Sequence, residues 1–201
     1  MTLTPHRYFL LNKPYNMVSQ FVSSHPVNLL CDLPFIFPDG IHAVGRLDHH
    51  SEGLLILTTN KKLTRLLFQG KLPHERTYHV LVNNTVTELQ LSQLQSGVQF
   101  KIKNAELYTT KPCTVKIIDR PPFNYPSTYI ASDRVPHTWL SITLTEGKFH
   151  QVRKMLAAVQ LKCKRLVRTS IEKINLNDLQ PSNIKEIPEK EFFAALNIDE
   201  Y

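Results

Sequence analysis

Segments with the alternation and residue content of strands outnumber helical segments in this sequence, and the two kinds do not alternate regularly. The expected strands are 7–13, 16–24, 40–46, 53–59, 76–84, 114–120, 138–145 and 164–171. The expected helices are 61–69, 85–97, 148–161 and 188–198. Strands that follow one another without an intervening helix indicate an α+β protein, with a central mixed and mostly antiparallel sheet flanked by helices, and not a doubly wound sheet.

Two of the expected helices carry more detailed expectations. Thr85 is the expected N-cap of the helix at 85–97, because Glu88 three residues later completes a capping box. The helix at 148–161 has an apolar stripe made of Phe149, Val152, Met155, Leu156 and Val159. We expect this stripe to face the core.

The loop after the strand at 40–46 is unusually rich in ionisable residues. Arg46 and Asp48 lie close together, and two histidines follow them. A lone loop aspartate most often forms a turn with its own backbone. A carboxylate that acts as a nucleophile or base must be kept ionised by a nearby cation, and Arg46 is poorly placed for this, two residues away on a strand end. Both interpretations of Asp48 stay open, and the second requires a more distant arginine.

Positive charge is concentrated around the last long helix. The chain has a net charge of +7, and residues 145–169 hold seven lysines and arginines against one glutamate. Lys148, Gln151 and Arg153 lie at the start of the helix, where backbone N–H groups also favour anions. This pattern indicates either a polyanion partner such as nucleic acid, or a solvated helix face. Arg153 is a candidate for the distant arginine.

Tyr78 lies on the same face of its expected strand as Val80 and Val82. A tyrosine in that position is usually part of the core. In a nucleic-acid site it could instead stack on a base.

Several classes of protein are excluded. Three cysteines that lie far apart form no disulfide framework and no CxxC pair. The N-terminal region has an apolar run of only four residues, too short for a signal peptide or a membrane span. We therefore expect a cytoplasmic protein.

Four motifs in order along the chain resemble those of bacterial pseudouridine synthases of the small-subunit type. FLLNKPYNMV is similar to the N-terminal Asn-Lys-Pro motif, and GRLDHHSEGLLILTTN to the active-site signature. RTYHVLV is similar to the tyrosine motif, and LTEGKFHQVRKML followed by KRLVRTSI to the basic C-terminal motif. The proline-rich stretch at 120–136 and the strand after it also resemble the E-type large-subunit ribosomal RNA pseudouridine synthases, a subgroup without the S4-type RNA-binding domain.

The resemblance implies one catalytic domain over 1–201, with two subdomains that share one sheet, an active-site cleft across that sheet and no S4 domain. It implies an isomerase that flips out a specific uridine of ribosomal RNA, in the 23S RNA of the large subunit, and converts it to pseudouridine. No cofactor or metal is expected, because nothing is oxidised and no group comes from outside. RNA is the expected partner, with no membrane, and the protein is expected to be a monomer.

The resemblance also assigns roles to residues. It makes Asp48 the catalytic carboxylate, which attacks C1′, acts on the ring or assists formation of a glycal. Tyr78 would pack on the target base and serve the proton step at C5, and Arg153 would pair with Asp48. The pocket would include Arg46, Leu47, Leu166 and Val167. The RNA-binding residues would be Lys13, Lys148, His150, Gln151, Lys154, Lys164, Arg165 and Arg168.

The sequence departs from this branch in two places. Lys148, Phe149 and His150 replace a frequent Arg-Asn-Arg, a change expected to tune RNA affinity and not chemistry. Thr169, Ser170 and Ile171 replace a usual Ile-Gly, so no glycine turn is expected there.

Four alternatives remain to be compared. Two keep RNA as the partner: a transfer RNA pseudouridine synthase, and a non-catalytic RNA-binding factor for ribosome assembly. A metal-dependent hydrolase would use His42, Asp48, His49 and His50, but no second ligand cluster exists, and adjacent histidines on extended backbone would point apart. A DNA-binding helix-turn-helix near 148–170 lacks its partner helix, because a strand precedes Lys148.

Overall fold

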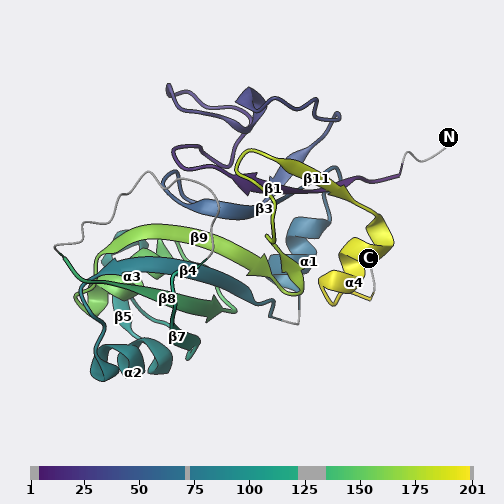
Figure 1. Ribbon diagram of the computed structural model, residues 1–201. Helices are drawn as coiled ribbons and strands as arrows, with labels where there is room; N and C mark the ends of the chain where they lie inside the picture. Colours follow the sequence, from purple (N-terminus) through teal and green to yellow (C-terminus); the bar gives the residue numbers. More distant parts are fainter. Residues whose placement is uncertain (1–4, 71–72, 122–134, 200–201) are drawn as a thin grey trace. The chain divides into compact units, whose positions relative to one another are not determined.

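The chain folds into two compact units (Figure 1). The computed structural model describes residues 5–70, 73–121 and 135–199. The first unit combines Met1–His74 with Arg168–Tyr201, and the second is Glu75–Val167. The organisation as two subdomains that share one sheet stays a prediction.

Each unit contains both strands and helices. The first unit contains β1 (Tyr8–Lys13), a 3-10 turn (Leu30–Asp32), β2 (His42–Val44), β3 (Glu52–Thr58), α1 (Leu63–Gln69), β10 (Ile174–Asn175), β11 (Ile184–Ile187) and α4 (Glu189–Ala195). The second contains β4 (Arg76–Asn83), α2 (Glu88–Ser96), β5 (Gln99–Lys101), a 3-10 turn (Lys103–Ala105), β6 (Leu107–Thr109), β7 (Thr114–Ile118), β8 (His137–Leu144) and α3 (Gln151–Ala158). Strand β9 (Cys163–Ile171) begins in the second unit and ends in the first.

In the first unit β1 lies between β3 and β11 and pairs antiparallel with both. All residues of β1 and β3 are buried, which explains their continuous apolar runs. The ring of Tyr8 stacks on Phe192 of α4 with centroids 4.6 Å apart, and Phe9 meets Phe35 edge-on at 5.7 Å. Apolar side chains therefore cover both faces of these strands.

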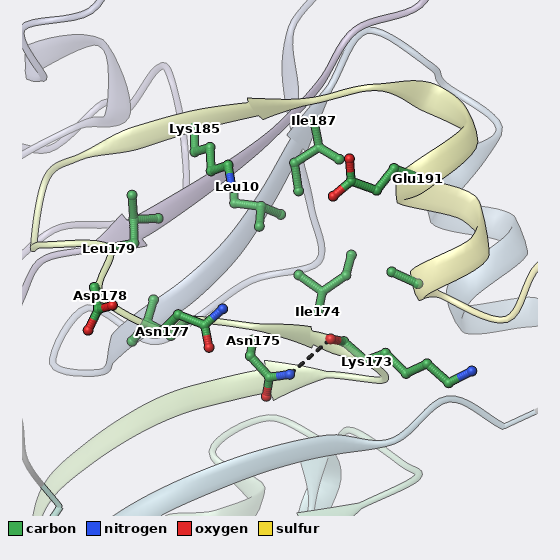
Figure 2. Close-up of a pocket in the computed structure, with 12 residues that line it drawn as sticks. Leu10, Lys173, Ile174, Asn175, Asn177, Asp178, Leu179, Lys185, Ile187 and Glu191 are labelled. Carbon is green, nitrogen blue, oxygen red and sulfur yellow. Dashed lines mark hydrogen bonds between the residues drawn. The ribbon is translucent and has the colours of Figure 1, made fainter.

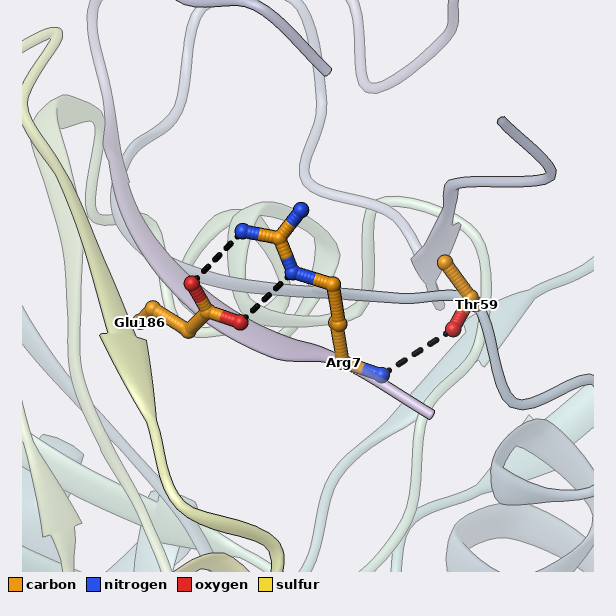
Figure 3. A network of polar contacts seen from close by, with 3 residues as sticks. All are labelled: Arg7, Thr59 and Glu186. Carbon is orange, nitrogen blue, oxygen red and sulfur yellow. Dashed lines mark hydrogen bonds and ion pairs between the residues drawn. The ribbon is translucent and has the colours of Figure 1, made fainter. Parts of the chain in front are cut away.

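A surface ion pair fixes the edge of this sheet (Figure 3). Arg7, just before β1, donates from Nε and Nη2 to the two carboxylate oxygens of Glu186 in β11, each at 2.7 Å. Its backbone N–H also donates to Thr59 Oγ1 at 3.0 Å. The pair is exposed, so we expect it to hold the register and to add little stability.

In the second unit α2 and α3 contribute to one core with β4, β7 and β8. The strand order is β4-β8-β7, and both pairs are antiparallel. The core includes Val80 and Val82 from β4 with Met155 and Leu156 from α3, and Tyr78 packs against its edge. The predicted face of β4 is confirmed.

The α+β class and the antiparallel pairing are confirmed, while some local expectations are wrong. The N-cap of α2 is Thr87, whose hydroxyl accepts from the Gln90 N–H, two residues later than expected. No strand forms at 16–24, where Met17 makes an isolated bridge to Asn28. The proline-rich loop at 120–136 lies largely outside the described residues.

Phe149 is the most consequential of these differences. It precedes α3 and is 75% exposed, whereas Val152, Met155, Leu156 and Val159 of the expected stripe are buried. Helical spacing failed here because residues 148–150 form a turn, and His150 at φ +55° separates them from the helix.

Candidate active site

Asp48 lies on a loop of the first unit that the surrounding residues hold at both ends. The loop joins β2 to β3. Just before Asp48, the Leu47 N–H donates to Ser19 Oγ at 2.9 Å, and the Ser19 hydroxyl donates to Leu47 O at 3.0 Å. Just after it, the Ser51 N–H donates to Asp48 O at 3.0 Å and closes a turn. The backbone of the half-buried Asp48 is therefore fixed from both sides, and nothing in the sequence marked Ser19 for this task.

A buried lysine accompanies Asp48. Lys13 ends β1 opposite Gly53, at the start of β3. Its side chain is fully buried, and Nζ donates to Met17 O at 2.6 Å and to Pro14 O at 2.9 Å. The pKa of Lys13 is lowered to about 7, chiefly by burial and also by the nearby Arg168, while the charges of Glu52 and Asp48 oppose this shift. Lys13, Asp48, Glu52 and Arg168 therefore form one interacting charge cluster.

Arg168 supports the strand that follows the loop. It is 3% exposed, and its Nε donates to Leu54 O at 2.7 Å. Its backbone approaches Gly53 so closely that a Cβ built there would lie 2.3 Å from Arg168 O. Among the described residues, Arg168 Nη2 has no hydrogen-bond partner. Gly53, in the signature motif, thus permits the close approach that anchors this end of the loop.

The lowered pKa of Lys13 gives a measurable dependence of stability on pH. The unfolded chain holds this proton up to about pH 10, while the folded chain releases it near pH 7. Between these values the unfolded state binds more protons, so the free energy of unfolding rises with pH, by at most about 1.4 kcal/mol per pH unit. We expect Lys13→Met to remove this rise in urea unfolding measured from pH 7 to 10. The Lys61→Met variant, changed at an exposed lysine, should keep this rise. If the free energy of unfolding had the same slope against pH in the wild type and both variants, a buried Lys13 with a lowered pKa would be contradicted.

The second unit carries the other expected site residues. Tyr78 in β4 is half-buried and lies opposite Ile142 of β8. Arg153 lies in the first turns of α3 and is half-buried. Leu166 and Val167 of β9 are 4% and 0% exposed. Tyr78 and Leu166 belong to the same apolar cluster of this unit.

A carboxylate of the second unit organises the start of α3. Glu146 accepts hydrogen bonds from the Tyr108 hydroxyl, from the Lys111 N–H at 3.2 Å and from Gln151 Nε2 at 2.6 Å. Burial, with the hydrogen bond to Glu146, raises the pKa of Tyr108 to about 12, so Tyr108 donates throughout the physiological range. Gln151 Oε1 in turn accepts from the Lys148 N–H at 2.8 Å. Glu146 and Gln151 thus hold the turn between them in place by hydrogen bonds.

The expected RNA-binding residues divide by burial. Lys13, Gln151, Arg165 and Arg168 are all at least nine-tenths buried. The polar atoms of Lys13 and Gln151 also form hydrogen bonds within the protein. Buried side chains of this kind are better suited to positioning other residues than to the expected surface contact with phosphate. Lys148 is exposed, and His150, Lys154 and Lys164 are partly exposed. These four have the accessibility that contact with RNA requires.

The histidines after Asp48 differ from the sequence prediction. Their rings do not point apart: the centroids of His49 and His50 are 4.6 Å apart, and His50 stacks on Tyr15 at 5.2 Å. The reason is that residues 49–50 lie in a turn and not on extended backbone. Within the described ranges no three His, Cys, Asp or Glu side chains lie together as metal ligands would. The geometry thus gives the metal-hydrolase alternative no support.

A separate pocket of about 510 Å³ lies in the first unit among β10, β11 and α4 (Figure 2). Its lining includes the apolar side chains of Leu10, Ile174 and Ile187 and charged side chains of both signs, among them Lys185 and Glu191. None of the expected site residues lines it.

Among the described residues, no helix is long and apolar enough to cross a membrane.

Comparison with known proteins identifies the family. The family model described as RNA pseudouridylate synthase matches residues 7–158, three quarters of the chain. The chain belongs to this family. The matched range contains Lys13, Asp48, Tyr78 and Arg153. The resemblance found in the four motifs is therefore confirmed, and so is the assignment as an isomerase.

Relatives of both expected types are found. The ribosomal large subunit pseudouridine synthase E of Vibrio vulnificus is 39% identical over 93% of this chain and 77% of its own. The ribosomal small subunit pseudouridine synthase A of Salmonella typhimurium is 30% identical over 94% of this chain and 74% of its own. A crystal structure of a pseudouridylate synthase superposes with a TM-score of 0.76 at 25% identity, over 97% of this chain and 76% of that one. The fold is thus that of a pseudouridine synthase.

Proposed function

We propose that this protein isomerises a uridine of ribosomal RNA to pseudouridine, and that its substrate is the RNA of the large subunit. The observation that carries the proposal is the placement of Asp48. It lies in the signature-like motif, within the range that the family model matches, on a loop held by hydrogen bonds of Ser19 and Ser51. The names of the relatives at 38–39% identity support the large subunit as target. We further propose that the protein acts in the cytoplasm as a monomer.

The chemistry requires only groups that the chain supplies. The N1–C1′ bond of the uridine breaks, the uracil rotates, and C5 bonds to C1′. The proton on C5 leaves and N1 gains one, so the reaction needs no oxidant, reductant or external group. The target base must first leave its helix, and the cost of unstacking it is on the order of a few kcal/mol.

We propose three residues for the work at the base. Asp48 acts at C1′ or on the ring, Tyr78 packs against the uracil and serves proton removal from C5, and Arg153 pairs with Asp48 and keeps it ionised. Asp48 belongs to one unit, and Tyr78 and Arg153 to the other. What supports their joint role is that all three lie in the range that the family model matches and in the motifs that resemble those of the family.

The remaining expected residues support these three. We propose that Arg46, Leu47, Leu166 and Val167 line the pocket. Leu47, Leu166 and Val167 are buried and suited to apolar packing, while Arg46 is exposed. A pocket of low dielectric would strengthen the proposed ion pair. Lys148, His150, Lys154 and Lys164 are the proposed contacts to the RNA backbone.

The test is a pseudouridine map of ribosomal RNA from cells that lack the protein and from cells complemented with it. Carbodiimide modification followed by reverse transcription should show one stop in large-subunit RNA that disappears in the deletion and returns with the wild type. A lost stop in small-subunit or transfer RNA would keep the reaction and change the substrate. An unchanged map of all these RNAs would overturn the proposal in favour of a non-catalytic RNA-binding factor.

A further inference from the structure

Phe149 is a large apolar side chain held outside the core, at the start of the basic helix α3. It is 75% exposed. Single exposed apolar residues are common on protein surfaces and need no special explanation. Three features of its surroundings, all within the second unit, distinguish this one.

The first feature is a rigid backbone. The turn from Lys148 to Gln151 is closed by the Gln151 N–H, which donates to Lys148 O at 3.0 Å, and by Gln151 Oε1, which accepts from the Lys148 N–H at 2.8 Å. Gln151 is itself tied to Glu146. Phe149 therefore lies at the tip of a turn that is fixed before any ligand arrives, which lowers the entropy lost on binding.

The second feature is a stack of rings. Phe149 lies against His150 with centroids 3.9 Å apart and planes 18° from parallel. His150 reaches this position with φ +55°, in the left-handed region that is uncommon for residues other than glycine. One face of the phenyl ring is thus supported, and most of the remaining ring surface is open to solvent.

The third feature is the charge around the ring. Lys154 Nζ lies 5.7 Å from the centroid of Phe149 and donates to Lys101 O at 2.9 Å. Lys148 Nζ lies 4.8 Å from the ring of Tyr108. An exposed aromatic ring with one lysine over it and another next to it in the chain is a combination with which proteins hold unpaired nucleotides, because the ring stacks on a base while the cations attract phosphate. An apolar protein partner would not favour the lysines.

We infer that Phe149 is a stacking platform for an unpaired RNA base that flanks the target uridine, with the neighbouring phosphate near Lys148 and Lys154. This inference deepens the proposed function and rests on it. It also gives a physical reason for Lys148-Phe149-His150 in place of the frequent Arg-Asn-Arg, because the change replaces a polar contact with the RNA by stacking on a base. Stacking tolerates any base, so the platform would hold the strand without reading its sequence.

The test measures how tightly the full chain binds a fluorescein-labelled single-stranded oligoadenylate, by fluorescence anisotropy at several salt concentrations. We expect Phe149→Ala to weaken binding by about 5- to 150-fold, the loss of one stacked base. Phe149→Tyr should bind like the wild type, and Phe149→Leu should resemble Phe149→Ala although it remains apolar. Ile36→Ala, which removes a side chain that is 96% exposed, is the control and should have no effect.

The salt dependence separates stacking from charge. Phe149→Ala should keep the slope of log affinity against log salt, whereas Lys148→Ala should reduce it by about 0.7. Equal affinities for the wild type and Phe149→Ala, or a Phe149→Leu variant that binds like Phe149→Tyr, would overturn the inference. Loss of self-association or of a protein partner in Phe149→Ala, with RNA binding intact, would also overturn it. A wild type that binds the oligoadenylate but changes no uridine in the pseudouridine map would contradict the proposed function and leave the binding comparison intact.

Discussion

Asp48→Asn is expected to abolish pseudouridine formation while the protein still folds and binds RNA. The amide has nearly the same shape as the carboxylate but can neither act as a nucleophile nor accept a proton, so the rate should fall by at least about 10³-fold. The fold should survive because the backbone of residue 48 is held by its neighbours: Ser19 bonds Leu47, and the Ser51 N–H bonds Asp48 O. Single-turnover formation of pseudouridine in ribosomal RNA measures the rate, and anisotropy measures binding.

The matched control is Asp39→Asn, which makes the same chemical change at an exposed position in the same unit. It should react like the wild type. The charge cluster predicts a second effect of Asp48→Asn: one of the two carboxylates that oppose the lowered pKa of Lys13 disappears, so that pKa should fall further. An Asp48→Asn protein that retains a tenth or more of the wild-type rate would remove Asp48 from the chemistry.

The sequence predicted the elements with a strong local pattern. The alternation in β4 and the apolar run of β3 were sufficient to predict these strands. Burial of one face of a strand produces an alternating pattern, and burial of both faces produces a continuous apolar run. Strands β5, β6, β10 and β11 are only two to four residues long and escaped prediction, since their pairing depends on distant partners. The N-cap of α2 was misplaced because two threonines, Thr85 and Thr87, offered similar signals.

The candidate site was predictable in its motifs and not in its supports. Asp48 and Arg153 stand in recognisable segments, but the clamp of Ser19 on Leu47 joins residues 28 positions apart. The burial of Lys13 was equally hidden, because a lysine before proline reads as an exposed strand end. Side-chain type suggested contact with phosphate, and only the three-dimensional packing separates the accessible Lys148 from the buried Lys13.

Gly53→Ala is expected to give the largest loss of stability among single-methyl additions in the first unit. At φ +104° the backbone is in a region that residues with a Cβ rarely adopt, and the added Cβ would lie 2.3 Å from Arg168 O and 2.8 Å from Arg168 N. Backbone atoms of a paired strand cannot rotate aside as a side chain can, so either β3 or β9 must move. Strain and overpacking together should lower the free energy of unfolding by about 3 kcal/mol or more.

Gly40→Ala separates the two contributions to this loss. Gly40 has φ +74°, but no atom lies within 4 Å of a Cβ built there, so its substitution tests backbone strain alone. In urea unfolding at one pH, the free energy of unfolding of Gly40→Ala should be about 1 kcal/mol lower than that of the wild type, and that of Gly53→Ala should be much lower than both. Equal losses in the two variants would show that the close approach to Arg168 is absent in solution. Because Gly53 lies opposite Lys13 and follows the Asp48 loop, a displaced β3 should also slow pseudouridine formation, in proportion to how far the loop moves with it.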